Sequence, residues 1–177
     1  MRIEIENFGN EIKFIENNKL THYGMYSISW LKHKKTLFSF DDKLISTLKS
    51  KVKFSGIKHL INFNNEILEL KLKGGLLKNY YECFYKKVYY QIIIHNGYKT
   101  SIFMNNKQIA YYDKKPLAIY DSQKALLICN SDINKDLIYS FISALELSLE
   151  QNENISIDFG NISKDFKSFD DKWIPEN

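Results

Sequence analysis

Apolar and polar residues alternate with a period of two through most of the chain. In the first stretch, RIEIENFGNEIKFI, the alternation runs on both sides of Phe8–Gly9–Asn10. This pattern is typical of a strand, a turn and a second strand with one face in water. It recurs in MYSISWL, TLFSF and LISTL, which the short polar segments KHKK and DDK separate. The pattern predicts a succession of short antiparallel strands.

The stretch from Lys86 to Asn130 predicts a five-stranded meander. Asn96–Gly97 separates VYYQIIIH from YKTSIFM, and both residue types tolerate the positive φ of a type I′ hairpin turn. Asn105–Asn106 and Asp113 to Pro116 mark further turns, as does Asn64–Asn65 in an earlier hairpin. Roughly eleven or twelve strands result, and so many must curl or close to avoid long exposed edges. We expect a mainly β protein, a closed or nearly closed antiparallel β-barrel of about 12 strands.

Period two does not decide which face of the strands around Asn105–Asn106 points inward. One candidate face carries Ile102, Met104, Ile109 and Tyr111, and the alternate face carries Ser101, Phe103 and Ala110.

One segment departs from the strand pattern. LIYSFISALELSL, from Leu137 to Leu149, has apolar residues on nearly every face, which predicts a helix surrounded by protein. We expect this central helix over about Ile133 to Leu149, capped by Ser131 or Asp132. The apolar run is about 20 Å long, short of the ~30 Å hydrocarbon core of a bilayer.

Glu146 is the acidic residue within this apolar run. Burying an uncompensated charge costs roughly several kcal/mol of folding free energy, so the Glu146 carboxylate must reach solvent or a polar partner. We expect the helix end to emerge into solvent at Glu146, and the alternative is an internal polar partner.

The length of 177 residues predicts one domain, 1–177, in which 150–177 forms a C-terminal extension with a short strand and an aromatic tail. The amino-terminal stretch MRIEIENFGN has no apolar leader pattern, and no stretch approaches the ~20 apolar residues of a membrane span. We expect a cytoplasmic protein, and the alternative is one that is peripheral to a membrane.

The side chains that usually carry chemistry are scattered along the chain. Cys83 and Cys129 lie in apolar runs, which predicts buried, reduced thiols. The histidines lack metal-site spacing, and we expect them at the surface or at strand ends: His22, His33, His59 and His95. No phosphate-binding glycine loop and no nucleophile motif is present in the sequence. We therefore expect no enzyme, with no catalytic residue, no cofactor and no metal.

Positive charge is concentrated in one part of the chain. From Lys32 to Lys58 there are eight lysines and two aspartates, a net +6, whereas Glu146 to Asn177 holds eight acids and three lysines, a net −5. Arg2 is the sole arginine, and lysine lacks the planar fork that reads bases, which argues against sequence-specific nucleic-acid binding. The lysines either solvate the surface, as in a protein from an AT-rich genome, or contact an anionic surface. The candidates for that contact are Lys32, Lys34, Lys35, Lys49, Lys51 and Lys53.

Three stretches resemble the tubby carboxyl-terminal-like superfamily, which includes tubby domains, phospholipid scramblases and LURP-one proteins. They are HLINFNNEILELKLKG, HNGYKTSIFMNNKQIAYYDK and KALLICNSDINKDLIYSFISALELSL, and together they cover roughly His59 to Leu149. The resemblance, to a bacterial-type member, implies a closed barrel of about twelve strands around a hydrophobic helix. The lipid-binding Lys and Arg of tubby domains and the Cys cluster of scramblases have no matching positions here, so no site residues are carried over.

Two functions follow as expectations. In the first, the protein is a non-enzymatic binding module for an acidic membrane surface, meaning phospholipid, or for an acidic partner. In the second, it is a small cytoplasmic protein-binding factor, an immunity or regulatory protein, acting through its tail or its barrel surface. The tail residues that would contact such a partner are Phe166, Phe169 and Trp173.

Overall fold

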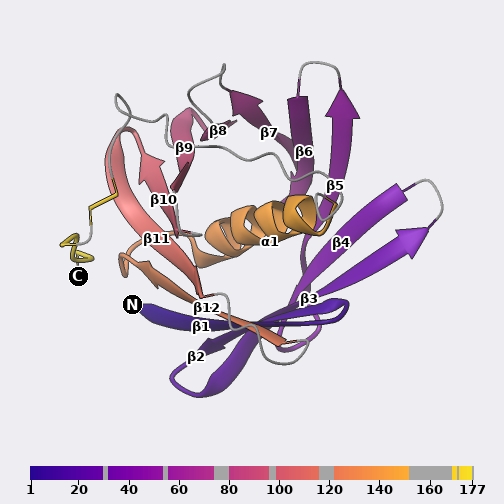
Figure 1. Ribbon diagram of the computed structural model, residues 1–177, viewed down its shortest axis with the longest axis horizontal. Helices are drawn as coiled ribbons and strands as arrows, with labels where there is room; N and C mark the ends of the chain where they lie inside the picture. The colour runs from indigo at the N-terminus through magenta and orange to yellow at the C-terminus, as the bar shows by residue number, and fades with distance from the viewer. Residues whose placement is uncertain are drawn as a thin grey trace.

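The computed structural model describes residues 1–29, 32–53, 56–73, 80–95, 99–115, 122–151, 169–170 and 172–176. Twelve strands and one helix occupy these ranges (Figure 1). The strands are β1 (Arg2–Phe8), β2 (Glu11–Glu16), β3 (Lys19–Ser29), β4 (Lys32–Ser39), β5 (Leu44–Lys53), β6 (Gly56–Phe63), β7 (Glu66–Lys73), β8 (Tyr80–Tyr85), β9 (Val88–His95), β10 (Lys99–Met104), β11 (Lys107–Lys115) and β12 (Ser122–Cys129). The helix is α1 (Lys135–Gln151).

The strands form a closed up-and-down barrel. Each strand pairs antiparallel with the next along the chain, and β1 closes the circle by pairing with β12, where Ile3 lies opposite Leu127. The amino terminus is held at this seam, because the Met1 ammonium donates to the Cys129 carbonyl at 2.8 Å. The predicted antiparallel barrel is confirmed, and closure leaves the sheet without an edge strand.

Four hairpins turn through two residues that both have positive φ, and all four lie at one end of the barrel. Asn64–Asn65 and Asn105–Asn106 confirm two predicted turns, and Asn17–Asn18 adds a third asparagine pair. The fourth, Lys86–Lys87, carries no turn signal in the sequence. Backbones of this kind suit type I′ turns, whose twist matches that of the strands. The predicted Asn96–Gly97 turn lies outside the described residues. The turn predicted to begin at Asp113 is wrong, because β11 continues to Lys115 and Asp113 pairs with Leu126 of β12.

Helix α1 runs through the inside of the barrel, as predicted (Figure 1). Its side chains from Leu137 to Leu145 are buried, and the helix packs mainly against β4, β5 and β6. The cap differs from the prediction: the Leu137 amide donates to Asn134 Oδ1 at 3.2 Å, so Asn134 takes the place expected of Ser131 or Asp132. Among the described residues, no helix has the length and apolar character needed to cross a bilayer.

Small polar residues let the helix approach the wall at β5. Ser140 Oγ lies 2.8 Å from Ser46 Oγ and also donates to the Asp136 carbonyl at 2.8 Å. Away from this contact, the Tyr139 ring stacks on Phe14 with ring centroids 4.3 Å apart. The barrel interior is therefore filled by the helix, with hydroxyl contacts on one side and aromatic packing on another.

A β-bulge between β10 and β11 decides which side chains of these strands point into the barrel, a question that the alternation in the sequence left open. Ile102 lies opposite Ala110, and the register shifts between Ile102 and Phe103. Ile102, Ala110 and Tyr112 belong to the core, whereas Tyr111 packs outside against Phe169. Neither candidate face of the sequence analysis survives intact, because the extra residue of a bulge reverses the alternation within one strand.

Candidate functional site

Lysines line the outer face of β4 to β7, and we call this surface the lysine wall. Its described side chains include Lys34, Lys49, Lys58 and Lys71, and also Lys73 at the end of β7, which pairs with Glu82. They alternate along their strands with residues that point into the barrel, such as Leu37, Leu48, His59 and Leu70. The predicted Lys32 lies in β4, and the predicted Lys51 and Lys53 lie in β5, but the side chains of all three are outside the described set.

Like charges face each other across the strands of this wall. Lys34 lies directly opposite Lys49, and Lys58 lies opposite Lys71. Directly opposed like charges destabilise a sheet by roughly 0.2–1 kcal/mol per pair, so this register works against folding stability. A row of such pairs creates a local positive potential.

Carboxylates offset part of this charge. Glu69 contacts both Lys58 and Lys71, the latter at 3.1 Å, and the hydrogen bonds from these two ammonium groups lower the pKa of Glu69. Among the described residues, no carboxylate lies within ion-pair distance of Lys34 or Lys49. The wall therefore keeps an excess of positive charge, and its β4–β5 half lacks a described counterion.

Lys35 was predicted to contact an anionic surface, but the structure buries it. Its side chain is only 1% exposed, because Lys35 shares the inward face of β4 with Leu37. Its ammonium lies 5.9 Å from the centre of the Tyr26 ring. Adjacent lysines of one strand point to opposite faces, so Lys34 and Lys35 cannot both reach an outer surface.

The aromatic tail lies on another wall of the barrel. Phe169 contacts His95 and Tyr111, and Trp173 contacts Tyr111, all on the outer face of β9 and β11. The predicted Phe166 and the short strand expected in 150–177 lie outside the described residues.

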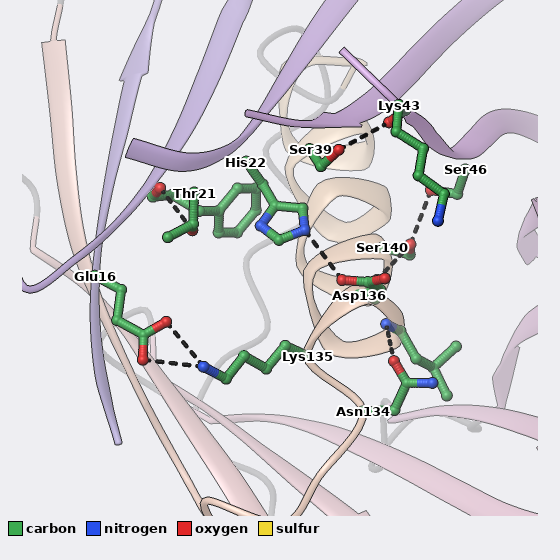
Figure 2. Close-up of polar contacts among 12 residues, drawn as sticks. Glu16, Thr21, His22, Ser39, Lys43, Ser46, Asn134, Lys135, Asp136 and Ser140 are labelled. Carbon is green, nitrogen blue, oxygen red and sulfur yellow. Dashed lines mark hydrogen bonds and ion pairs between the residues drawn. The ribbon is translucent and has the colours of Figure 1, made fainter. Parts of the chain in front are cut away.

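Polar contacts fix the first turn of α1 where it enters the barrel (Figure 2). Lys135 pairs with Glu16 of β2 at 2.9 Å, and Asp136 contacts His22 of β3 at 3.0 Å. Both partners come from neighbouring strands, so the first turn is held by side chains that lie more than a hundred residues away in sequence. We interpret this cluster as positioning the helix.

Glu146 is buried within the barrel, which corrects the expectation that the helix emerges into solvent there. Its carboxylate is 2% exposed and accepts hydrogen bonds from Asn7 Nδ2 at 2.7 Å, Tyr112 Oη at 2.8 Å and Lys114 Nζ at 2.8 Å. Burial, and next the Glu146 charge, raise the pKa of Tyr112 well above its usual value. The alternative of an internal polar partner is the correct one.

His59 is also buried, which corrects its expected place at the surface or at a strand end. Its Nδ1 lies 2.8 Å from Ser50 Oγ, and burial lowers its pKa to about 4. Its Nε2 has no hydrogen-bond partner among the described residues. The sequence carried a signal for this position, because alternation through Ile61 and Phe63 places His59 on their face.

The described side chains form no arrangement that reads as a metal centre. Within the described ranges, no three His, Cys, Asp or Glu side chains gather as metal ligands would. Cys83 and Cys129 are free and buried, as predicted, and burial raises the pKa of these thiols to about 12 and about 11.

Fold and surface together define a closed twelve-stranded antiparallel barrel with an internal helix and a lysine-rich outer wall. Comparisons with protein-family models, with curated proteins and with solved structures find no match.

Proposed function

We propose that the protein is a non-enzymatic binding module that docks its lysine wall on an anionic phospholipid surface. The opposed lysine pairs carry this proposal, because their repulsion weakens the folded sheet and would be relieved by bound phosphates. A barrel wound around a helix also supports placing the chain in the tubby carboxyl-terminal-like superfamily, as a bacterial-type member.

The binding free energy expected from the wall lysines is that of a reversible interaction. Each positive charge near an anionic leaflet contributes about 1 kcal/mol, and Glu69 offsets one of the four charges of Lys34, Lys49, Lys58 and Lys71. These lysines therefore supply roughly 3 kcal/mol, and salt screens this attraction. Binding should therefore weaken steeply between low and physiological salt. An acidic protein would bind through the same positive charge, and vesicle flotation distinguishes such a partner from lipid.

Flotation with vesicles of phosphatidylcholine, with or without phosphatidylserine, tests the proposal. We expect flotation only with phosphatidylserine, and we expect the double substitution Lys34→Glu, Lys49→Glu to abolish it. The matched control is Lys13→Glu, Lys124→Glu, which makes the same change of charge at lysines paired with Glu11 and Glu6. Because exposed pairs contribute little, this control should stay folded.

Two results would overturn the proposal. No flotation with phosphatidylserine at low salt excludes lipid and leaves an acidic protein as the partner for the wall. Equal losses in the two double variants would show that only net charge matters. The protein-binding alternative through the tail has less support, because Phe169 and Trp173 face the barrel.

A further inference from the structure

We propose that the outer face of β9, β10 and β11 is a peptide-binding surface, occupied here by residues 169–176 of the same chain. We call these residues the tail segment. The partner that fits has two aromatic residues four positions apart and a carboxylate three positions later, the spacing of Phe169, Trp173 and Glu176. This surface is separate from the lysine wall, so the two proposals stand or fall independently.

The face under the tail segment is buried although it lies outside the barrel. Ser101 lies opposite Tyr111 on one side and Ile93 on the other, so all three share the outer face. Ser101 and Ile93 are buried, and Phe103, two residues along β10, is 7% exposed. By contrast, the apolar Ile67 and Phe84 of β7 and β8 are 71% and 68% exposed. In Figure 1 the carboxyl end lies outside the barrel, beside β11.

Phe169 is held on three sides by groups of this face. Its ring centroid lies 5.4 Å from that of His95 and 5.5 Å from that of Tyr111, both in edge-to-face geometry. The Lys99 ammonium lies 4.6 Å from the same centroid, a favourable cation–π arrangement. His95 Nε2 lies 3.0 Å from Ser101 Oγ, which fixes the plane of the imidazole.

Trp173 and Glu176 also contact the barrel, in addition to Phe169. The Trp173 ring stands edge-to-face on Tyr111 at 6.5 Å, so one tyrosine serves both aromatic residues. The backbone amide of Glu176 donates to Asn130 Oδ1 at 2.9 Å, and the Glu176 carboxylate pairs with Lys107. The Ser131 amide donates to the Glu176 carbonyl at 3.3 Å. The surface thus recognises aromatic rings, backbone and charge together.

These contacts suit an exchangeable ligand. The Lys107–Glu176 pair is exposed, with 62% and 60% of the two side chains accessible, and Ile174 points into solvent. Described tail residues form no strand pairing with the barrel. Because the tail segment belongs to the same chain as the surface, its effective concentration is roughly millimolar, so weak contacts suffice. A free segment of the same chemistry can then compete.

The first test uses the full chain with its own ligand disabled. A labelled peptide of the sequence FDDKWIPEN is titrated into the variant Phe169→Ala, Trp173→Ala and into the unmodified protein. Because the tail segment of the unmodified protein covers the surface, we expect binding at least ~10-fold tighter to the variant. A peptide with both aromatic residues replaced by alanine should not bind, and Tyr111→Ala added to the variant should abolish binding. Failure of the peptide to bind the folded variant at millimolar concentration, or equal binding to both proteins, overturns the proposal.

The second test keeps the tail intact and covers the case in which the double variant does not fold. Trp30 and Trp173 are the two tryptophans, so Trp30→Phe leaves Trp173 as the sole reporter. An excess of peptide FDDKFIPEN, which has no tryptophan, should shift the Trp173 emission to longer wavelength as the tail is displaced into water. Emission that does not change at saturating peptide overturns the proposal.

Discussion

At the scale of single residues, the barrel buries several polar groups around the helix. His59 and Glu146 illustrate two different solutions. His59 stays neutral because burial lowers its pKa to about 4, whereas the Glu146 carboxylate has three hydrogen-bond donors around it. Protonation of buried His59 would destabilise the folded protein, whereas buried Glu146 would destabilise it if a hydrogen-bond partner were removed.

We expect His59 to make stability depend on pH. Its pKa in the folded protein, about 4, lies below its ordinary value of 6.5, so between these values the unfolded chain binds a proton that the folded chain does not. The stabilisation is therefore complete above pH 6.5 and is lost as pH falls towards 4, by about 3 kcal/mol in all. Urea unfolding at pH 7.5 and 4.5 measures it. His59→Gln should lose most of this pH dependence, and a His59→Gln variant that keeps it would contradict the assignment.

We expect Glu146→Ala to lower the free energy of unfolding by roughly 3–5 kcal/mol, because Lys114 would keep a buried charge without its partner. The matched control, Glu6→Ala, removes an exposed pair with Lys124 and should cost less than about 1 kcal/mol. Adding Lys114→Met to Glu146→Ala should recover part of the loss, since the uncompensated charge is gone. Chemical denaturation of the four proteins measures these differences, and similar costs for the two alanine variants would contradict the buried pair.

At the scale of elements, four hairpins at one end of the barrel share one backbone geometry but not one sequence. Asparagine tolerates positive φ and is a natural residue in three of these turns. Lys86 and Lys87 adopt φ of 48° and 65° without that tolerance, while the Lys86 ammonium lies 5.2 Å from the centre of the Tyr85 ring. The barrel imposes this turn because β8 and β9 must pair in a register fixed by their buried faces.

We expect Lys87→Gly to raise the free energy of unfolding by about 1 kcal/mol, because glycine adopts positive φ without steric cost and Lys86 keeps its contact with Tyr85. The reciprocal change Asn65→Lys, at φ 62°, should lower it by a similar amount. Thermal and urea unfolding give both values. A Lys87→Gly variant that is less stable than the parent would argue against strain at this turn.

At the scale of the whole molecule, closure and the internal helix depend on each other. The barrel has no edge in which to begin local opening, and α1 fills its interior from Leu137 to Leu145. Contacts at both ends of the described helix come from distant strands, at Glu16 and His22 on one side and at Asn7 on the other. The helix cannot leave its place without opening the wall.

We expect the α1 amides from Tyr139 to Leu145 to exchange hydrogen only through global unfolding. Their free energies of exchange should equal the free energy of unfolding from denaturant, and they should fall in parallel with it as urea is added. Native-state hydrogen exchange read by NMR measures this. Helix amides that exchange faster than those of β5 and β6 would contradict a helix enclosed by the barrel.

Part of the fold and of the candidate site was readable from the sequence, because it depends on neighbours along the chain. Alternation defined strands, asparagine pairs defined turns, and an apolar run of 13 residues defined the helix. Lys34 and Lys49 belong to one lysine-rich stretch of the sequence, and the structure places them opposite each other because one short hairpin joins their strands. Lys58 and Lys71 were missed as wall residues, because register across β5, β6 and β7 brings them in.

Only the tertiary structure decided which side chains face inward and what they meet. Alternation separated Lys34 from Lys35 but could not say which of the two enters the barrel, and the bulge beside Ile102 reversed the alternation there. The partners of Glu146 stand 32, 34 and 139 residues away, so no local pattern could reveal them. The sequence by itself determined the elements, because propensity and periodicity act over a few residues. Barrel closure decided their environments, because burial and pairing of polar groups depend on residues brought together from the whole chain.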